Sequence, residues 1–135
     1  VLHAKIIDAT QKKIEISHAE KFLSSSKFGA IIYFLGTVRN INENKKVIGI
    51  TYDSRDSMVI KSFEEIYKES EKKLNIKEKA VFIEHVKGYV KVEEKSIIIG
   101  VACRHRDEAY KLSRYFIEEI KKKTPIGKKS ITLMK

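Results

Sequence analysis

Residues 96–123, SIIIGVACRHRDEAYKLSRYFIEEIKKK, place a strand directly before a helix, and this pair decides the fold class. The stretch from Ser96 to Cys103 is almost continuously apolar and largely β-branched, which is typical of a strand buried within a sheet. From Arg106 to about Lys123 the apolar residues recur at helical spacing, and Pro125 ends the helix. The apolar stripe of this helix consists of Ala109, Leu112, Phe116, Ile117 and Ile120. We therefore expect one face of the helix to pack on the sheet.

Further strands and helices surround this pair in irregular order. Residues 29–38, GAIIYFLGTV, predict a strand covered on both faces, and residues 56–74 predict a second long helix. We expect Ser17 to cap a short helix that ends near Ser24, and residues 39–46 to form a polar loop. Shorter strands are expected at residues 2–8, 47–52, 80–86 and 130–134. Because strands and helices mix without βαβ alternation, the sequence predicts an α+β fold with a mixed or antiparallel sheet and two main helices.

The composition indicates one domain and an anionic partner. A chain of 135 residues fits a single domain over residues 1–135, and 42% hydrophobic residues can supply a core. Lys and Arg number 28 against 18 Asp and Glu, which gives a formal net charge of +10. This surplus predicts a nucleic acid, a membrane surface, a phosphorylated metabolite or an acidic protein as partner, without choosing among them.

The cysteine and histidine content argues against a disulfide-linked protein and against a metal-binding protein. Cys103 is the only cysteine, which excludes an internal disulfide or a zinc site built on several thiolates and suits a reducing compartment. Its place in an apolar run predicts a core residue. The histidines His3, His18 and His85 lack metal-ligand spacing, so we expect no metal and no cofactor. The first residues are too polar for a signal peptide, and no apolar run could span a bilayer, so we expect a cytoplasmic protein.

Three consecutive lysines end the last helix, and they differ in what lies four residues earlier. Glu118 precedes Lys122 and Glu119 precedes Lys123, which are favourable solvent-face ion pairs. Ile117, a member of the apolar stripe, precedes Lys121. This register predicts that Lys121 lies along the buried face, where loss of water favours a neutral amine that can act as a nucleophile or acid–base group. The alternative is a lysine whose stem crosses the edge of the core and whose ammonium reaches water.

Three other basic segments stand where strands or helices end. Arg104, His105 and Arg106 lie at the strand–helix junction, where free N–H groups of a helix start favour an anion. Residues 36–39, GTVR, leave the other apolar strand, and residues 125–129, PIGKK, form a constrained turn. Each segment could equally be a solvated strand end, loop or tail.

Together these segments predict one anion-binding cleft. An α+β sheet could gather five side chains at strand and helix ends, namely Arg39, His105, Arg106, Lys121 and Lys128. Cations and an imidazole without a clear carboxylate partner suit a phosphorylated anionic substrate better than hydrolysis by paired acids.

These blocks, in this order, resemble the catalytic (large) subunits of molybdopterin synthase. The resemblance covers most of the chain and rests on blocks at residues 29–40, 52–58, 85–88, 104–110 and 121–129. Its specificity lies in the spacing. The family's His-Arg pair falls at His105 and Arg106, and its two lysines flank a proline at Lys121 and Lys128.

The resemblance implies a fold, a reaction and partners. The family has an α/β hammerhead fold that forms a homodimer, and each subunit binds a small ubiquitin-like sulfur-carrier subunit, which gives a heterotetramer. It converts cyclic pyranopterin monophosphate to molybdopterin in molybdenum cofactor biosynthesis. Two sulfur transfers from the carrier's C-terminal thiocarboxylate form the dithiolene.

The same resemblance implies roles for individual residues. Lys121 would be the principal catalytic lysine, Lys128 would bind and polarise the substrate, and His105 would orient it or transfer protons. The implied substrate-binding set is Thr37, Val38, Arg39, His105, Arg106, Lys121, Lys128, Lys129 and Ser130.

The chain departs from the family pattern at several positions. Gly127 stands where a large residue is usual, Val86 where an arginine often follows the histidine, and Ser130 where a glutamate is common. The chain also ends at Lys135, short of the tail of many members. These departures keep open a catalytically inactive, carrier-binding subunit. The net charge keeps open a nucleic-acid-binding module, although the aromatic residues lie mostly in apolar runs.

Overall fold

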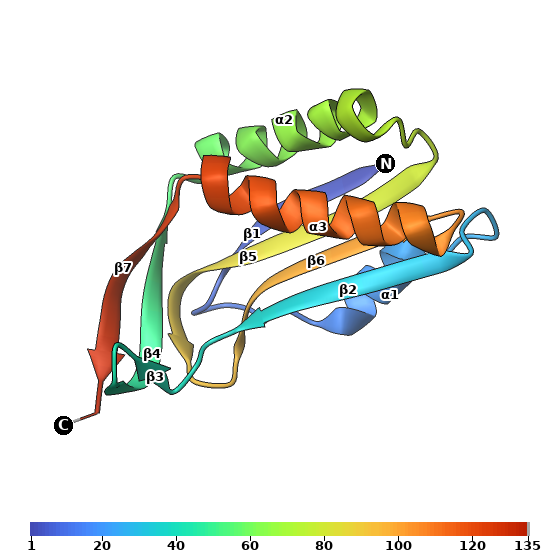
Figure 1. Ribbon diagram of the computed structural model, residues 1–135. Coiled ribbons are helices and arrows are strands. Elements are labelled where there is room, and N and C mark those ends of the chain that lie inside the picture. The colour runs from blue at the N-terminus through green and yellow to red at the C-terminus, as the bar shows by residue number, and fades with distance from the viewer. Residues whose placement is uncertain (135) are drawn as a thin grey trace.

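A seven-stranded mixed sheet and three helices make up the fold in the computed structural model, which describes residues 1–134 (Figure 1). The helices are α1 (Ile16–Leu23), α2 (Asp56–Leu74) and α3 (Arg106–Lys123). The strands are β1 (Leu2–Asp8), β2 (Ala30–Thr37), β3 (Ile41–Asn42), β4 (Lys45–Ser54), β5 (Lys79–Lys91), β6 (Lys95–Cys103) and β7 (Ile126–Leu133). The α+β class and the mixed sheet predicted from the sequence are thereby confirmed.

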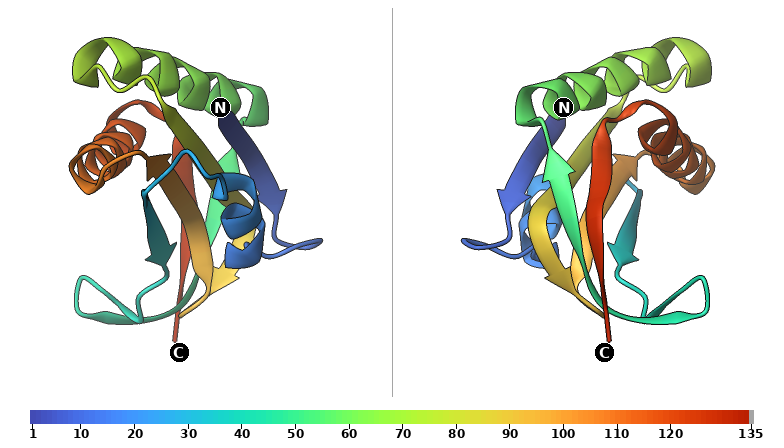
Figure 2. Two further views of the ribbon diagram at one scale, coloured as in Figure 1. Left: turned by 90° about the vertical axis from the view of Figure 1, so that its right-hand side faces the viewer. Right: turned by 90° about the vertical axis from the view of Figure 1, so that its left-hand side faces the viewer.

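The long strand β5 joins the two halves of the sheet. The strand order is β2-β6-β5-β4-β3, with β1 parallel to β5 and β7 antiparallel to β4. Before Gly88, β5 pairs with β6 and β1; from Gly88 onward it pairs with β4. Gly88 has a φ of +97°, a conformation that favours glycine, and it lies where β5 changes partner. The strands β4 and β7 therefore run side by side away from the helices (Figure 2).

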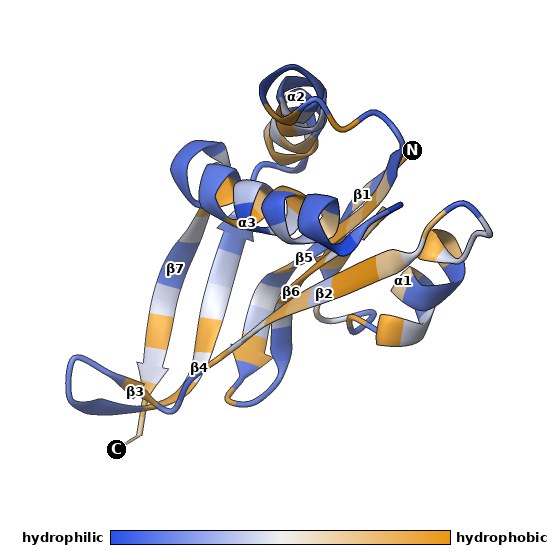
Figure 3. Cartoon of the chain, turned by 45° about the vertical axis from the view of Figure 1, so that its right-hand side comes forward, coloured by the Kyte–Doolittle hydropathy of each residue, from blue (hydrophilic) through white to orange (hydrophobic). Residues whose placement is uncertain are grey.

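Helices cover both faces of the β1-β5-β6-β2 half of the sheet. The helices α2 and α3 lie on one face and α1 on the other (Figure 2). Figure 3 shows the hydrophobic residues concentrated on the central strands, while the outer sides of α2 and α3 are hydrophilic. Such one-sided helices bury their apolar stripe against the sheet.

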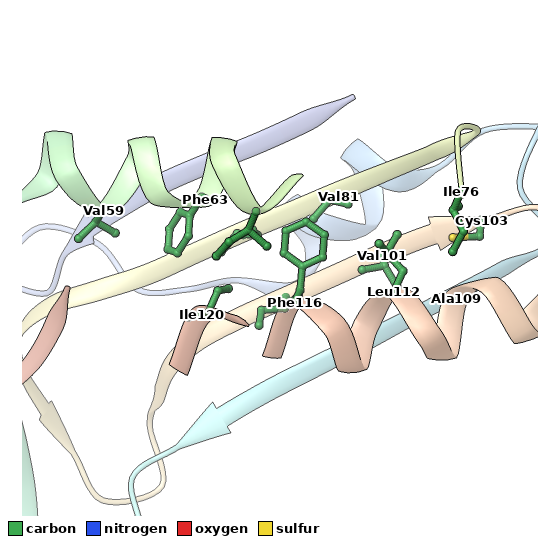
Figure 4. Packing of buried hydrophobic residues seen from close by; sticks show 13 residues of the cluster. Val59, Phe63, Ile76, Val81, Val101, Cys103, Ala109, Leu112, Phe116 and Ile120 are labelled. Atoms are coloured by element: carbon green, nitrogen blue, oxygen red, sulfur yellow. The ribbon is translucent and has the colours of Figure 1, made fainter. Parts of the chain in front are cut away.

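The core beneath α2 and α3 fixes where α3 lies. Phe63 of α2 and Phe116 of α3 are fully buried, and they pack with Val81, Val101 and neighbouring side chains of the sheet (Figure 4). A second cluster, around Phe82, fills the opposite face beneath α1. The predicted stripe of α3 is confirmed, because Ala109, Leu112, Phe116 and Ile120 are buried and Ile117 packs against them.

The sequence predicted both long helices and the buried strand β6 within a residue at each end. It was wrong about α1, which begins at Ile16 after Glu15 and has no side-chain cap, so Ser17 lies inside the helix. It also missed the hairpin within residues 39–46, where β3 returns to β4 through Glu43 and Asn44, both with positive φ.

The strand β2 is less covered than its apolar sequence predicted. It lies at the edge of the sheet and pairs with β6 alone, so its side chains contact both core clusters but are mostly half-buried, and Ile31 is 40% exposed. The last strand is longer than predicted, because β7 begins at Ile126 and follows β4 along most of its length.

Within residues 1–134, no helix combines the length and the apolarity that crossing a membrane requires.

Replacing Phe116 with alanine tests whether this core holds the fold. Phe116 is fully buried, so the variant leaves a cavity, and we expect it to lose about 3–5 kcal/mol of unfolding free energy in urea titrations. The control is Tyr110→Ala on the same helix, where the side chain is 65% exposed. It should change stability by no more than about 0.5 kcal/mol. Equal losses in the two variants would contradict the packing described.

Candidate active site

A pocket lies where the C-terminal end of α3 passes into β7 beside the sheet. It encloses about 290 Å³. Its walls are mainly apolar and come from β2, β6, α3 and β7, through Phe34, Ile97, Ile99, Ile117, Ile120 and Ile126. Its polar side chains are His85, Lys121, Thr124 and Lys128. The pocket thus joins two cations and one imidazole to an apolar wall, and no carboxylate is among the residues found to line it.

The turn between α3 and β7 brings the two lysines together. The helix ends at Lys123, Thr124 is extended, and Pro125 prevents a further helical turn. The Thr124 hydroxyl lies 2.9 Å from the Ser62 hydroxyl of α2, which holds the end of α3 against its neighbour. The chain then runs back along β7, so that Lys128 lines the same pocket as Lys121. The predicted approach of these two lysines is confirmed.

The three lysines at the end of α3 differ in their ion-pair partners. Lys123 lies 2.7 Å from Glu69 and 2.9 Å from Glu119, and Lys122 lies 3.7 Å from Glu119. The hydrogen bonds to Glu69 and Glu119 raise the pKa of Lys123. Lys121 makes no ion pair within residues 1–134 and borders the pocket instead. The register argument therefore separated Lys121 correctly from its two neighbours. The predicted pairing of Lys122 with Glu118 is wrong, because Glu118 pairs with Arg114 at 3.4 Å and Lys122 faces Glu119.

The predicted burial of Lys121 is wrong. The side chain is exposed, because its helix turn lies at the end of the core, where only the pocket faces it. The alternative is closer to the structure, because Lys121 is exposed and lines the pocket together with Ile117. Its chemistry must therefore come from its place at the mouth of the pocket.

Sequence reasoning did not select His85 for the site, although the resemblance included its block. His85 lies on β5, is 7% exposed, and lines the pocket together with both lysines. Its Nδ1 is 2.7 Å from the backbone oxygen of Val86, and the Tyr52 ring meets it edge-on at 5.1 Å. Burial lowers the pKa of His85 below its ordinary value, since a charged imidazole would lose its hydration there. The signal in the sequence was a histidine that directly follows the apolar-rich run at residues 80–83 and Glu84.

The segment after β2 contributes less than predicted. Arg39 and Thr37 are exposed just beyond Gly36, whose register partner Ile97 lines the pocket. Val38 points elsewhere: it is 3% exposed within the second core cluster. Its N–H donates to the Glu94 oxygen and its own oxygen accepts from the Glu93 N–H. The expectation that Val38 lines a substrate pocket is therefore corrected to a packing role.

The predicted gathering of four cationic side chains and the His105 imidazole in one cleft does not occur within one chain. His105 and Arg106 stand at the start of α3, whereas Lys121 stands near its end. The fifteen residues from Arg106 to Lys121 separate their backbones by about 22 Å at the rise of an α-helix. One copy of the chain thus brings Lys121 and Lys128 together and leaves His105 and Arg106 apart.

The remaining predicted positions lie along β7. Lys129 borders a second, more open hollow of about 400 Å³, which adjoins the first through Lys128, and Ser130 is exposed beside it. Gly127 borders the same hollow, and within residues 1–134 no atom beyond Gly127 and its two chain neighbours lies within 4 Å of the place that a Cβ would take. Its departure from the family pattern therefore opens space without disturbing the packing. Val86 is buried in the second core cluster, away from both lysines.

Cys103 is a core residue, as predicted. It is fully buried beneath α3, and burial raises the pKa of its thiol to about 11. A thiol so protected carries almost no thiolate at neutral pH. The Cys103 thiol is therefore placed for packing and not for reaction as a nucleophile.

The fold and the pocket define a small α+β protein with two lysines at one largely apolar pocket, and comparison with known proteins identifies its family. The family model described as "MoaE protein" matches residues 9–123. The chain belongs to this family.

Relatives with curated names agree with this assignment. A protein of Synechococcus elongatus named molybdopterin synthase catalytic subunit is 35% identical over 90% of this chain and 73% of its own length. Proteins of the same name from Pyrococcus abyssi and Homo sapiens are 34% and 36% identical, over 87% and 93% of this chain and 78% and 66% of their own lengths. The resemblance read from the sequence is confirmed.

Solved structures share the fold. Molybdopterin synthase from Staphylococcus aureus superposes with a TM-score of 0.82 at 24% identity, covering 97% of this chain and 96% of that chain. A second match, with a TM-score of 0.75 at 23% identity, covers 98% of this chain and 90% of that chain. It comes from a protein–protein complex of subunits 1 and 2 of molybdopterin-converting factor from Helicobacter pylori.

The depressed pKa of His85 predicts a pH dependence of stability. The unfolded chain binds a proton at this imidazole more readily than the folded chain does, so the contribution of neutral His85 is present above its ordinary pKa of about 6.5 and is lost as the pH falls through its lower folded value. Urea unfolding of the wild type should therefore show stability falling on acidification from pH 7.5. The His85→Asn variant should show a shallower fall. Identical slopes would contradict a buried, neutral imidazole.

Proposed function

We propose that this chain is the sulfurtransferase subunit that converts cyclic pyranopterin monophosphate to molybdopterin. The observation that carries this proposal is the pairing of Lys121 and Lys128 at one apolar pocket, in a chain whose curated relatives are molybdopterin synthase catalytic subunits. Two lysines offer six N–H donors and two positive charges, which suit an anionic substrate. The apolar wall suits a flat heterocycle.

The site residues take distinct roles in this proposal. Lys128, which lines the pocket, holds the substrate anion, and Arg39 takes part as the resemblance implies. The other implied binding residues, Thr37, Lys129 and Ser130, are exposed. Lys121 acts at the carbon or thiocarboxylate centre where sulfur is exchanged. It suits this role because neither Glu118 nor Glu119 engages it, so its ammonium is free to meet a ligand.

The sulfur comes from a partner in this proposal. Cys103 is buried and its thiol is protonated, so the donor is the thiocarboxylated C-terminus of a small ubiquitin-like carrier subunit. The two-subunit complex from Helicobacter pylori supports such a partner. The net charge of +10 would favour docking of an acidic carrier. We place the reaction in the cytoplasm and assign it to one domain over residues 1–135.

His105 and Arg106 join the site from a second copy of the chain. They lie about 22 Å from Lys121 along α3, so within one copy they cannot share a small ligand with it. In a twofold dimer each copy can supply them to the other's pocket. Exposed apolar side chains on β3, β4 and β7, including Ile41, Ile48 and Leu133, support self-association. The homodimer is the core of the proposed heterotetramer.

Replacing Lys121 with alanine tests the role of the lysine at the pocket mouth. Because Lys121 borders the pocket and makes no ion pair within residues 1–134, the variant should fold normally. Molybdopterin formation from cyclic pyranopterin monophosphate and the thiocarboxylated carrier should fall by about a hundredfold or more.

The matched control is Lys122→Ala. It removes the same charge from the adjacent position, where the side chain faces Glu119 instead of the pocket. This variant should keep nearly all activity. Full activity of Lys121→Ala, or equal losses in both variants, would refute the role given to Lys121.

Mixing two inactive variants tests whether the site is shared between copies. Lys121→Ala and Arg106→Ala are each expected to form little product alone. In a random mixture, half of the dimers contain one of each variant, and one of their two pockets is intact if Arg106 acts across the dimer. Activity should then recover to about a quarter of the wild type. No recovery after verified subunit exchange would place both residues in the same copy's site.

A further inference from the structure

We propose that His85 is the hydrogen-bond acceptor of the pocket: its Nε2 receives an N–H or O–H group of the substrate and so fixes how the ring lies between the two lysines. This assignment rests on the proposed function, and it adds a substrate-contacting residue outside the set of residues assigned to the site above.

The contact with the backbone settles which ring nitrogen carries the proton. A carbonyl oxygen can only accept, so the 2.7 Å contact requires Nδ1 of His85 to donate to the oxygen of Val86. In the neutral ring this leaves the lone pair on Nε2. Within residues 1–134 no hydrogen-bond partner lies at Nε2. The tautomer therefore presents an unengaged acceptor, and the residue that carries it lines the pocket.

The surroundings keep this ring neutral. His85 is 7% exposed, and Tyr52 of β4 covers it edge-on. The charged side chains that share its pocket are Lys121 of α3 and Lys128 of β7, and both are cations. A protonated imidazole would lose its hydration in this buried place, which lowers the pKa of His85, so the neutral acceptor state is the stable one.

The charged side chains of the pocket are donors. Ammonium groups donate and never accept, and the hydroxyl of Thr124 already shares a hydrogen bond with Ser62 at 2.9 Å, so Nε2 of His85 is the acceptor without a partner among the lining side chains. The lysines therefore select an anion, whereas Nε2 of His85 selects a donor. A phosphorylated heterocycle that carries N–H or O–H groups satisfies both requirements, and an anion without such donors satisfies only one.

The hydrogen bond that holds the His85 ring in the fold does not involve Nε2. The bond to Val86 uses only Nδ1, and Nε2 is not among the buried polar atoms that lack a partner, so it is accessible from the pocket. A substrate donor placed against Nε2 would form a hydrogen bond in place of one to water. The sign of this effect predicts that loss of Nε2 weakens substrate binding, while loss of Nδ1 weakens the fold.

Two substitutions separate these functions. Asparagine can place an amide donor near the position of Nδ1 but has nothing at Nε2, and glutamine can place an amide near the position of Nε2 but has nothing at Nδ1. We expect His85→Asn to keep its melting temperature close to that of the wild type and to raise KM for cyclic pyranopterin monophosphate about tenfold, with the carrier's affinity unchanged. His85→Gln should melt lower and recover most of the KM. As the control for unrelated histidines, His18→Asn on α1 should match the wild type.

Long-range ¹H–¹⁵N NMR of the free protein tests the tautomer without any substrate. A protonated Nδ1 and an unprotonated Nε2 at neutral pH would support the inference, and the opposite tautomer would overturn it. A wild-type KM in His85→Asn, with the wild type active, would overturn the role of His85 alone. Absence of product from the wild type with thiocarboxylated carrier would overturn the proposed function, and the substrate role of His85 with it.

Discussion

The packing of α3 on the sheet is the interaction on which the site depends. Leu112, Phe116 and Ile120 are buried in the core that α3 forms with β6, β2 and α2, and this fixes both the rotation of the helix and its end point. Lys121 follows Ile120 directly, so the core positions the lysine at the pocket mouth. The Ser62–Thr124 contact and Pro125 then turn the chain into β7, which returns Lys128. Apolar burial thus determines the distance between two cations that would otherwise repel each other.

The electrostatics of the helix end follow from the same geometry. Glu69 of α2 and Glu119 of α3 both form ion pairs with Lys123. This pairing lowers the pKa of each carboxyl group. These carboxylates are therefore engaged away from the pocket. The cations that remain at the pocket face an apolar wall, where an anionic ligand meets little competition from the protein's own acids. This arrangement favours a small anionic substrate over the long backbone of a nucleic acid.

Local periodicity predicted much of the fold and part of the site. The stripe of α3, the position of Pro125 and the apolar run of β6 depend on neighbours within a few residues, and the sequence shows such neighbours directly. The same register separated Lys121 from Lys122 and Lys123. Long-range pairing was less accessible: the edge position of β2 and the full length of β7 depend on strands that are distant in sequence.

The site residues that the sequence missed or misassigned also depend on long-range contacts. His85 was missed because its role comes from the α3–β7 turn lying over β5, a contact that no local pattern predicts. Val38 was assigned to the site wrongly because only the tertiary fold shows that its side chain turns into the second core cluster. The length of α3 forbids a single-copy cleft containing both Arg106 and Lys121, although the sequence places both at element ends.

Single-turnover formation of molybdopterin tests the central claim most directly. The wild-type chain would be combined with its thiocarboxylated carrier and cyclic pyranopterin monophosphate, and dithiolene product would be quantified against carrier consumed. The account predicts product with two carrier thiocarboxylates consumed per molecule. Tight carrier binding with an intact thiocarboxylate and no product would contradict it and would indicate a subunit that binds the carrier without catalysing sulfur transfer.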